Sequence, residues 1–231
     1  AASAAAVRAA GGLLMATEKG LGVFDQERGT LEIVEPHDFE PGFRTNDGKV
    51  DPAGNFWWST MDEDNGRRPG VVYRTDKTME TRRVLTGIHI PNTISVNPDG
   101  TRLYMADSRL QTIFVHDTAD LTKVTAFAHT RGERGTPDGS AVDAQGYLWN
   151  AQWGGGRVVR YAPDGRIDRI VELPVERPTS CAFGGEDLTT LYVTSAWDGL
   201  DPEARAQQPL AGGLFAFDAG VKGLALPLFE G

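Results

Sequence analysis

Three polar side chains occupy one repeated position, five residues before the second member of a Val-Asp or Val-Asn step. They are Asn46, Asn92 and Asp138. Amide and carboxylate oxygens, without thiolates or clustered imidazoles, are the ligands that hard divalent cations such as Ca²⁺, Mg²⁺ and Mn²⁺ prefer. Such a cation can polarise an ester carbonyl, activate water and stabilise an oxyanion. The residue types therefore indicate metal-assisted hydrolysis, provided that the fold brings the three side chains together.

The elements that must position these residues are predicted to be short β-strands. A hydrophobic pair that follows a turn recurs about every 45 residues, a period that suits the four-stranded blade of a β-propeller. Residues 156–173 read as two strands joined by a Pro-Asp-Gly turn. Helical periodicity is nearly absent, and residues 201–208 are expected to form a loop or a single turn. The recurring pairs are Leu13-Leu14, Phe56-Trp57, Leu103-Tyr104, Leu148-Trp149 and Leu191-Tyr192.

In a propeller the first strand of each blade lines the central channel, so equivalent positions form a ring at its mouth. Asn46, Asn92 and Asp138 are predicted to converge there. Each of these segments is also a turn-forming sequence, and turn formation alone is the competing interpretation. The shared register favours the ring. The same register falls on Ser3 in the first unit and on residues 179–180 in the last.

The number of repeats bounds the architecture. A unit of about 45 residues fits roughly five times into this chain. A ring with an open side would leave unpaired sheet edges. The first hydrophobic pair already lies at Leu13-Leu14, so the strands that would precede it in a six-bladed ring are not in the sequence. We therefore expect an all-β, six-bladed propeller, a single domain over residues 1–231, with about five blades represented and the N-terminal blade missing or incomplete.

Composition excludes several classes of partner. The formal net charge is −9, which argues against nucleic acid and anionic membranes because both require a basic face. No apolar segment approaches the roughly 20 residues that span a bilayer. The single cysteine, Cys181, cannot form an internal disulfide, which favours a reducing, cytoplasmic compartment. These features fit a protein that binds a small molecule.

Longer blocks around the repeated positions resemble the regucalcin and gluconolactonase family of sugar lactonases. The resemblance extends from about residue 6 to residue 231, and the blocks keep the family's order and spacing. They are RTNDGKVDPAGNFWWSTM (44–61), IPNTISVNPDGTRLYMADS (90–108), TPDGSAVDAQGYLWNAQWGGGRVVRYAPDG (136–165), RPTSCAFGGEDLTTLYVTSAWDGL (177–200) and QPLAGGLFAF (208–217).

The resemblance implies a six-bladed propeller that hydrolyses a sugar lactone, a small molecule, to its open-chain acid. One divalent cation, Ca²⁺, Mg²⁺, Mn²⁺, Zn²⁺ or Fe²⁺, is expected in the central tunnel, held by a first-blade Glu, an Asn and an Asp. The family's metal-binding Asn and Asp match Asn92 and Asp138. Its substrate-orienting Arg and Asn match Arg44 and Asn46.

The sequence also departs from the family pattern. The first-blade Gly-Glu-x-Pro-x-Trp segment that carries the metal-binding Glu is absent, and Glu18 is no substitute because it follows the hydrophobic pair in a strand connection. Weak metal binding and impaired turnover are therefore expected of these residues alone. Thr93 replaces the family's usual Gly. An acidic residue that approaches substrate in some members corresponds to Asp64 or Glu63.

The predicted mechanism centres on Asp138 as both metal ligand and general base, because no histidine has a motif that places it at the channel mouth. Arg44 and Asn46 are predicted to orient the substrate, and Trp153 is a candidate for stacking on a sugar. Two alternatives stay open. One is a metal-dependent phosphotriester hydrolase on the same propeller, and the other is a non-catalytic metal-binding or scaffold propeller, because the third ligand is absent.

Overall fold

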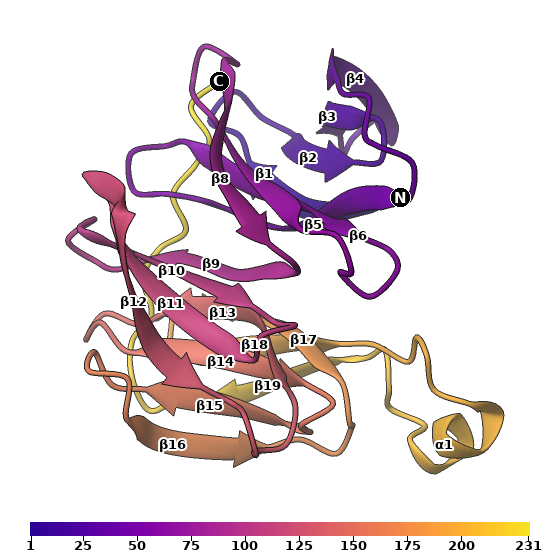
Figure 1. The fold of residues 1–231 in the computed structure, drawn as a ribbon, viewed down its shortest axis with the longest axis vertical. Helices are drawn as coiled ribbons and strands as arrows, with labels where there is room; N and C mark the ends of the chain where they lie inside the picture. Colours follow the sequence, from indigo (N-terminus) through magenta and orange to yellow (C-terminus); the bar gives the residue numbers. More distant parts are fainter.

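The computed structural model describes residues 1–231, which form five β-sheets (Figure 1). Four of the sheets have four strands and the fifth has three. In each sheet consecutive strands pair in antiparallel order, which is the construction of a propeller blade. The predicted all-β propeller is therefore confirmed, with five blades, numbered here in chain order.

In blades 1 to 4 the first strand is innermost and the fourth forms the outer edge. Blade 1 comprises β1 (Ala2–Val7), β2 (Leu13–Thr17), β3 (Gly20–Asp25) and β4 (Thr30–Pro36), and blade 2 comprises β5 (Phe43–Val50), β6 (Phe56–Asp62), β7 (Gly70–Thr75) and β8 (Thr81–Ile88). Blade 3 comprises β9 (Pro91–Val96), β10 (Arg102–Asp107), β11 (Thr112–Asp117) and β12 (Asp120–His129), and blade 4 comprises β13 (Thr136–Val142), β14 (Leu148–Trp153), β15 (Arg157–Tyr161) and β16 (Ile167–Glu172).

Blade 5 has three strands and carries the only helix, which protrudes from the ring (Figure 1). The loop or single turn expected at residues 201–208 is instead a six-residue α-helix. It forms because Asp201 caps its N-terminus, accepting a hydrogen bond of 2.8 Å from the amide of Ala204. This helix is too short and polar to cross a membrane. The elements are β17 (Pro178–Gly184), β18 (Thr190–Ser195), α1 (Pro202–Gln207) and β19 (Leu214–Asp218).

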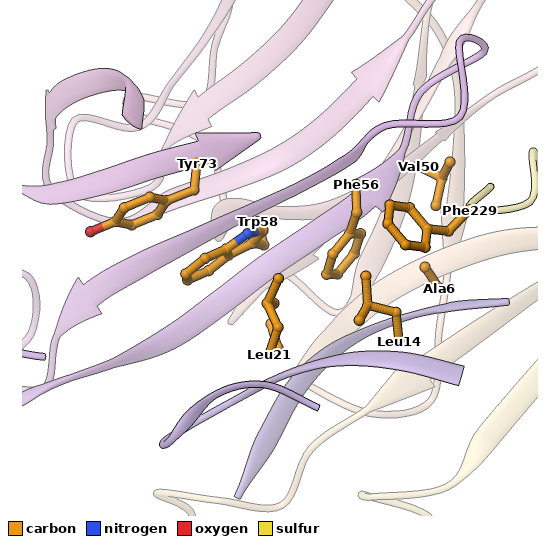
Figure 2. Close-up of a cluster of buried hydrophobic side chains, with 9 residues drawn as sticks. Ala6, Leu14, Leu21, Val50, Phe56, Trp58, Tyr73 and Phe229 are labelled. Atoms are coloured by element: carbon orange, nitrogen blue, oxygen red, sulfur yellow. The ribbon is translucent and has the colours of Figure 1, made fainter. Parts of the chain in front are cut away.

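The recurring hydrophobic pair packs on both faces of a blade. Successive residues of a strand point to opposite faces of the sheet. Phe56 therefore joins the core between blades 1 and 2 (Figure 2). Trp57 joins the core between blades 2 and 3. In blade 4, Leu148 and Trp149 divide in the same way between blades 3 and 5. In blades 2, 3 and 4 the pair thus links the blade to both neighbours.

The inner strands pack in chain order around the channel, from β1 through β5, β9 and β13 to β17. No comparable packing joins β17 to β1, so the ring has an open sector between blades 5 and 1. The pair members that face this sector, Leu13 and Tyr192, lack the cover of a neighbouring blade. Tyr192 is 37% exposed, whereas Tyr104, its counterpart in blade 3, is 1% exposed.

The C-terminal tail, residues 219–231, connects the two sides of the open ring (yellow in Figure 1). It leaves blade 5, forms a β-bridge with blade 4 between Gly223 and Asp143, and ends beside blade 1. There the amide of Phe229 donates to the carbonyl of Val7 at 2.8 Å. The Phe229 ring is fully buried in the core between blades 1 and 2 (Figure 2).

Candidate active site

A cavity of about 690 Å³ lies at one mouth of the channel. Its walls bring together four of the five residues predicted for the site, Arg44, Asn46, Asn92 and Asp138. They come from the starts of three inner strands, β5, β9 and β13. The other lining residues are Met61, Asn65, Ile90, Ser108, Arg109, Gln111, Thr136, Pro137, Trp153 and Asp198.

A β-bulge recurs in these inner strands at the predicted register or one residue after it. Two residues oppose one on the neighbouring strand at residues 46–47 of β5, 93–94 of β9 and 138–139 of β13. The pairing of blades 1 and 5 skips one residue at the same place, at Ser3 and Thr179. A bulge interrupts the alternation of side chains and redirects them. Asn46 and Asp138 are bulged residues, so the bulge redirects their side chains, whereas Asn92 is the last paired residue before the bulge of β9.

A chain of hydrogen bonds fixes the two asparagines. Arg44 Nη1 donates to Asn46 Oδ1 at 3.0 Å, and Asn46 Nδ2 donates to Asn92 Oδ1 at 3.2 Å. Asn92 Nδ2 donates to Ser108 Oγ at 2.9 Å, and that hydroxyl donates to the carbonyl of Pro137 at 2.6 Å. The chain crosses three blades. It sets the orientation of the Asn92 amide, whose oxygen keeps a second lone pair for a ligand.

Side chains of blades 3 and 4 hydrogen-bond to the backbone carbonyl of Asp138. Thr93 Oγ1 donates to the Asp138 carbonyl at 2.6 Å, and Asn150 Nδ2 donates to the same oxygen at 2.9 Å. Thr93 is fully buried and has a φ of 62°, a left-handed conformation that a β-branched residue rarely adopts. Thr93, which stands where the family usually has Gly, thus uses its hydroxyl to hydrogen-bond strand β9 of Asn92 to strand β13 of Asp138.

Asp138, on the cavity wall, has a second carboxylate, that of Asp47, close enough to shift its pKa. Burial raises the pKa of Asp138 well above its ordinary value, and the nearby charge of Asp47 raises it further, while the Gly139 amide and Arg44 oppose the shift. Burial also raises the pKa of Asp47, against the opposing charge of Lys49. Ionised carboxylates in this position are poorly solvated, so a cation placed between them and the cavity would be strongly stabilised.

The donor set fits a hard divalent cation as part of its coordination shell. Asn92 Oδ1 and the Asp138 carboxylate are oxygen donors of the kind that such cations bind. The carboxylate of Asp138 forms no ion pair with a side chain, so its charge is available to a metal. The structure contains no cluster of three His, Cys, Asp or Glu side chains that could hold a metal ion by itself. Asn92 and Asp138 would leave most coordination positions to other ligands.

Asp64 is the predicted site residue that the structure does not bring to the cavity. It lies in the loop after β6, its side chain is 74% exposed, and its nearest cation is Arg67 at 3.8 Å. Glu63 is also absent from the cavity walls. Glu18 is expected to lie away from the mouth, but it follows the second strand of blade 1 and so lies on the same side of the ring, exposed and outside the cavity walls. Trp153 does line the cavity, and the guanidinium of Arg177 lies 5.2 Å from its ring centroid.

Several lining residues follow second strands rather than beginning first strands. Asn65 follows β6, Ser108 and Arg109 follow β10, and Asp198 follows β18. An antiparallel second strand ends beside the start of the first, so its following turn reaches the same mouth. The hydrophobic pair marks the second strand in the sequence, so the turn a few residues after each pair could have been predicted to form the rim of the cavity.

Comparison with known proteins gives a consistent result. Residues 1–197 match the SMP-30/gluconolactonase/LRE-like region. A 6-deoxy-6-sulfogluconolactonase from Pseudomonas putida is 35% identical over 97% of this chain and 79% of its own length. An L-arabinolactonase from Azospirillum brasilense is 40% identical over 95% of this chain and 74% of its own length.

The fold agrees with a solved structure as well. The crystal structure of regucalcin from Agrobacterium tumefaciens, described as a calcium-binding protein, superposes with a TM-score of 0.92 at 34% identity. The match covers 99% of this chain and 79% of that protein. The resemblance inferred from the sequence blocks is confirmed, and the chain belongs to the SMP-30/gluconolactonase/LRE-like family.

Proposed function

We propose that the chain hydrolyses a sugar lactone to the open-chain sugar acid with the help of one divalent cation. The observation that carries this proposal is the convergence of Arg44, Asn46, Asn92 and Asp138 on one cavity. The cavity, at about 690 Å³, has a volume typical of small-molecule sites. Relatives named 6-deoxy-6-sulfogluconolactonase and L-arabinolactonase support the substrate class.

The residues of the cavity divide the chemistry among them. Asn92 and Asp138 would hold the cation, which supplies Lewis acidity toward the ester carbonyl and toward water. Asp138, on the cavity wall, is positioned to accept the proton of the attacking water. Arg44 and Asn46 orient the lactone, Arg44 through the N–H groups not already donated to Thr45 and Asn46.

We also propose that the complete propeller is a single domain of six blades, and that the sixth blade supplies a third, acidic metal ligand. The open sector between blades 5 and 1 supports this proposal, because it leaves the faces of Leu13 and Tyr192 uncovered. The regucalcin structure is longer than this chain, which covers 79% of it. Since that relative is described as calcium-binding, Ca²⁺ is the first cation to test.

The proposal is tested by assaying the 231-residue protein against five- and six-membered aldonolactones and against a phosphotriester, with Ca²⁺, Mg²⁺, Mn²⁺ or Zn²⁺ at millimolar concentration. We expect lactone hydrolysis that a chelator abolishes. Asp138→Asn should lower kcat by at least about 100-fold at saturating cation and substrate, because it removes the base and a charged ligand. Asp64→Asn removes the same charge outside the cavity and should leave kcat unchanged.

Other outcomes would separate the alternatives. Cleavage of the phosphotriester in preference to every lactone would assign the site to phosphorus chemistry. Cation binding by calorimetry with no turnover of either substrate would indicate a non-catalytic metal-binding propeller. Full activity in Asp138→Asn would remove the assignment of Asp138 as the base.

A further inference from the structure

Two arginines line the cavity, and the acceptors of both are uncharged. Arg44, on β5, donates to the carbonyl of Thr45 at 2.8 Å and to Asn46 Oδ1 at 3.0 Å. Arg109, on the rim, donates to the carbonyl of Asn65 at 2.8 Å. Neither guanidinium forms an ion pair. Each therefore keeps unused N–H donors and a full positive charge on the wall of the cavity.

Arg109 is fixed in place although its side chain is exposed. Its backbone amide donates to Asp107 Oδ1 at 3.1 Å, and Asp107 is 1% exposed. Its guanidinium reaches across to the Asn65 carbonyl in the loop of blade 2. That loop approaches blade 3 closely, since a Cβ on Gly66 would lie 2.3 Å from Ile90 Cγ1. The Asp107 bond thus fixes the backbone of Arg109, and the Asn65 carbonyl holds its guanidinium at the rim.

The charges of the cavity differ from those of the whole chain. The formal net charge of −9 repels anions from most of the surface. In the cavity two arginines face two aspartates, Asp138 and Asp198. Asp138 is assigned to the cation, so the cavity as a whole would be positive in the metal-loaded protein. An anion entering from the rim meets Arg109, whose planar fork matches the geometry of a carboxylate, sulfonate or phosphate.

We infer that the substrate is a lactone bearing an anionic group, a terminal oxyanion at the end of the carbon chain remote from the ring carbonyl, and that Arg109 binds this group. The inference rests on the proposed lactonase function and specifies its substrate class. The carbonyl end lies toward Asn92 and Asp138 at the inner strands, while the anionic end lies at the rim beside the turn after β10. Arg109 thus determines specificity rather than the rate of the chemical step.

Matched substrates test this assignment. Glucono-1,5-lactone is compared with its 6-phosphate and with the lactone of glucaric acid, which carry a terminal phosphate and a terminal carboxylate. Wild-type protein should have a higher kcat/KM for the charged lactones. Arg109→Gln should lower the ratio of charged to neutral kcat/KM by about 10- to 100-fold, the usual effect of a lost charge-assisted hydrogen bond. Arg109→Lys should retain part of the ratio, and rising salt should reduce it.

Arg67→Gln is the matched control, because it removes an exposed arginine that does not line the cavity. It should leave the ratio unchanged. Hydrolysis of the neutral lactone with no preference for charged ones, or an equal ratio in Arg109→Gln and Arg67→Gln, would overturn the inference while leaving the lactonase proposal intact.

Binding of the product acids gives a readout that does not need turnover. Calorimetry with Ca²⁺ present should show 6-phosphogluconate binding more tightly than gluconate, and Arg109→Gln should remove most of the difference. If no lactone is hydrolysed, the lactonase proposal fails and this measurement still decides the role of Arg109. Equal binding of the two acids by the wild-type protein would show that the rim does not recognise an anion.

Discussion

The loss of one buried charge at the end of β13 should destabilise the propeller more than the same change in blade 2. Asp143 is fully buried and accepts hydrogen bonds from Arg160 Nε at 2.9 Å and Arg160 Nη2 at 2.7 Å. It also accepts from Trp149 Nε1 at 3.0 Å. Asp51 occupies the equivalent position of blade 2 and accepts from Trp57 Nε1 at 2.7 Å, but no arginine reaches it.

The expected magnitudes follow from this difference. Asp51→Asn keeps the shape of the side chain and leaves the Trp57 indole without its acceptor, a cost of about 1 kcal/mol. Asp143→Asn loses the same kind of bond and also leaves Arg160, which is 7% exposed, opposite a neutral amide. Breaking a buried ion pair costs about 3–5 kcal/mol. Asp168, whose Oδ2 lies 2.7 Å from Arg160 Nη1, still pairs with the Arg160 charge in the variant. The expected loss of stability is therefore at the lower end of that range.

Urea unfolding and calorimetry measure both variants. In a protein of this size each kcal/mol lowers Tm by about 2–4 °C, so Asp143→Asn should melt about 6–12 °C below wild type and Asp51→Asn about 2–4 °C below it. Replacing the partner as well, in Asp143→Asn with Arg160→Met, should recover part of the loss because no buried charge is left unpaired. Equal losses in the two single variants, with unchanged m-values, would refute the assignment of the difference to the Arg160 pair.

Three further predictions concern the site and its surroundings. Arg44→Ala should raise KM for the lactone more than it lowers kcat, and steady-state kinetics at saturating cation would show an unchanged KM if Arg44 does not contact substrate. Without metal, the raised pKa of Asp138 means that its contribution to stability is fully present below its unfolded pKa of about 3.9 and is lost as pH rises toward the folded pKa. Urea unfolding in chelator should therefore show stability falling from pH 4 upward, less steeply in Asp138→Asn, and equal slopes would contradict the assignment. Burial raises the pKa of the Cys181 thiol to about 12, so the folded protein at pH 8 should not react with a disulfide reagent, whereas the unfolded chain should react at one thiol.

The sequence is most informative for residues that occupy the same structural position in every blade. The hydrophobic pair reveals the period, and the structure explains why, since the two members of a pair such as Phe56 and Trp57 fill two different cores. The register of Asn46, Asn92 and Asp138 was visible for the same reason, because each begins an inner strand and the bulge recurs with it.

Residues that do not repeat were harder to predict. Asp64 was chosen by analogy with family members, but it lies in an irregular loop whose path the repeat does not determine. Arg109 is placed by a contact with Asn65 between two blades, and no pattern within one blade encodes that contact. The helix at 202–207 depends on the local cap at Asp201, which outweighed the low helical periodicity of the chain.

The C-terminal tail changes how the blades share stability. Stacked blades that touch only their neighbours behave as a linear array, in which the two end units unfold at the lowest free energy. Phe229 inserts into the core between blades 1 and 2, although the C-terminal tail that carries it follows blade 5. Unfolding of blade 1 would therefore also release the tail that follows blade 5. The two ends are therefore expected to exchange their amide hydrogens as one cooperative unit, and removal of the Phe229 ring would separate them into two.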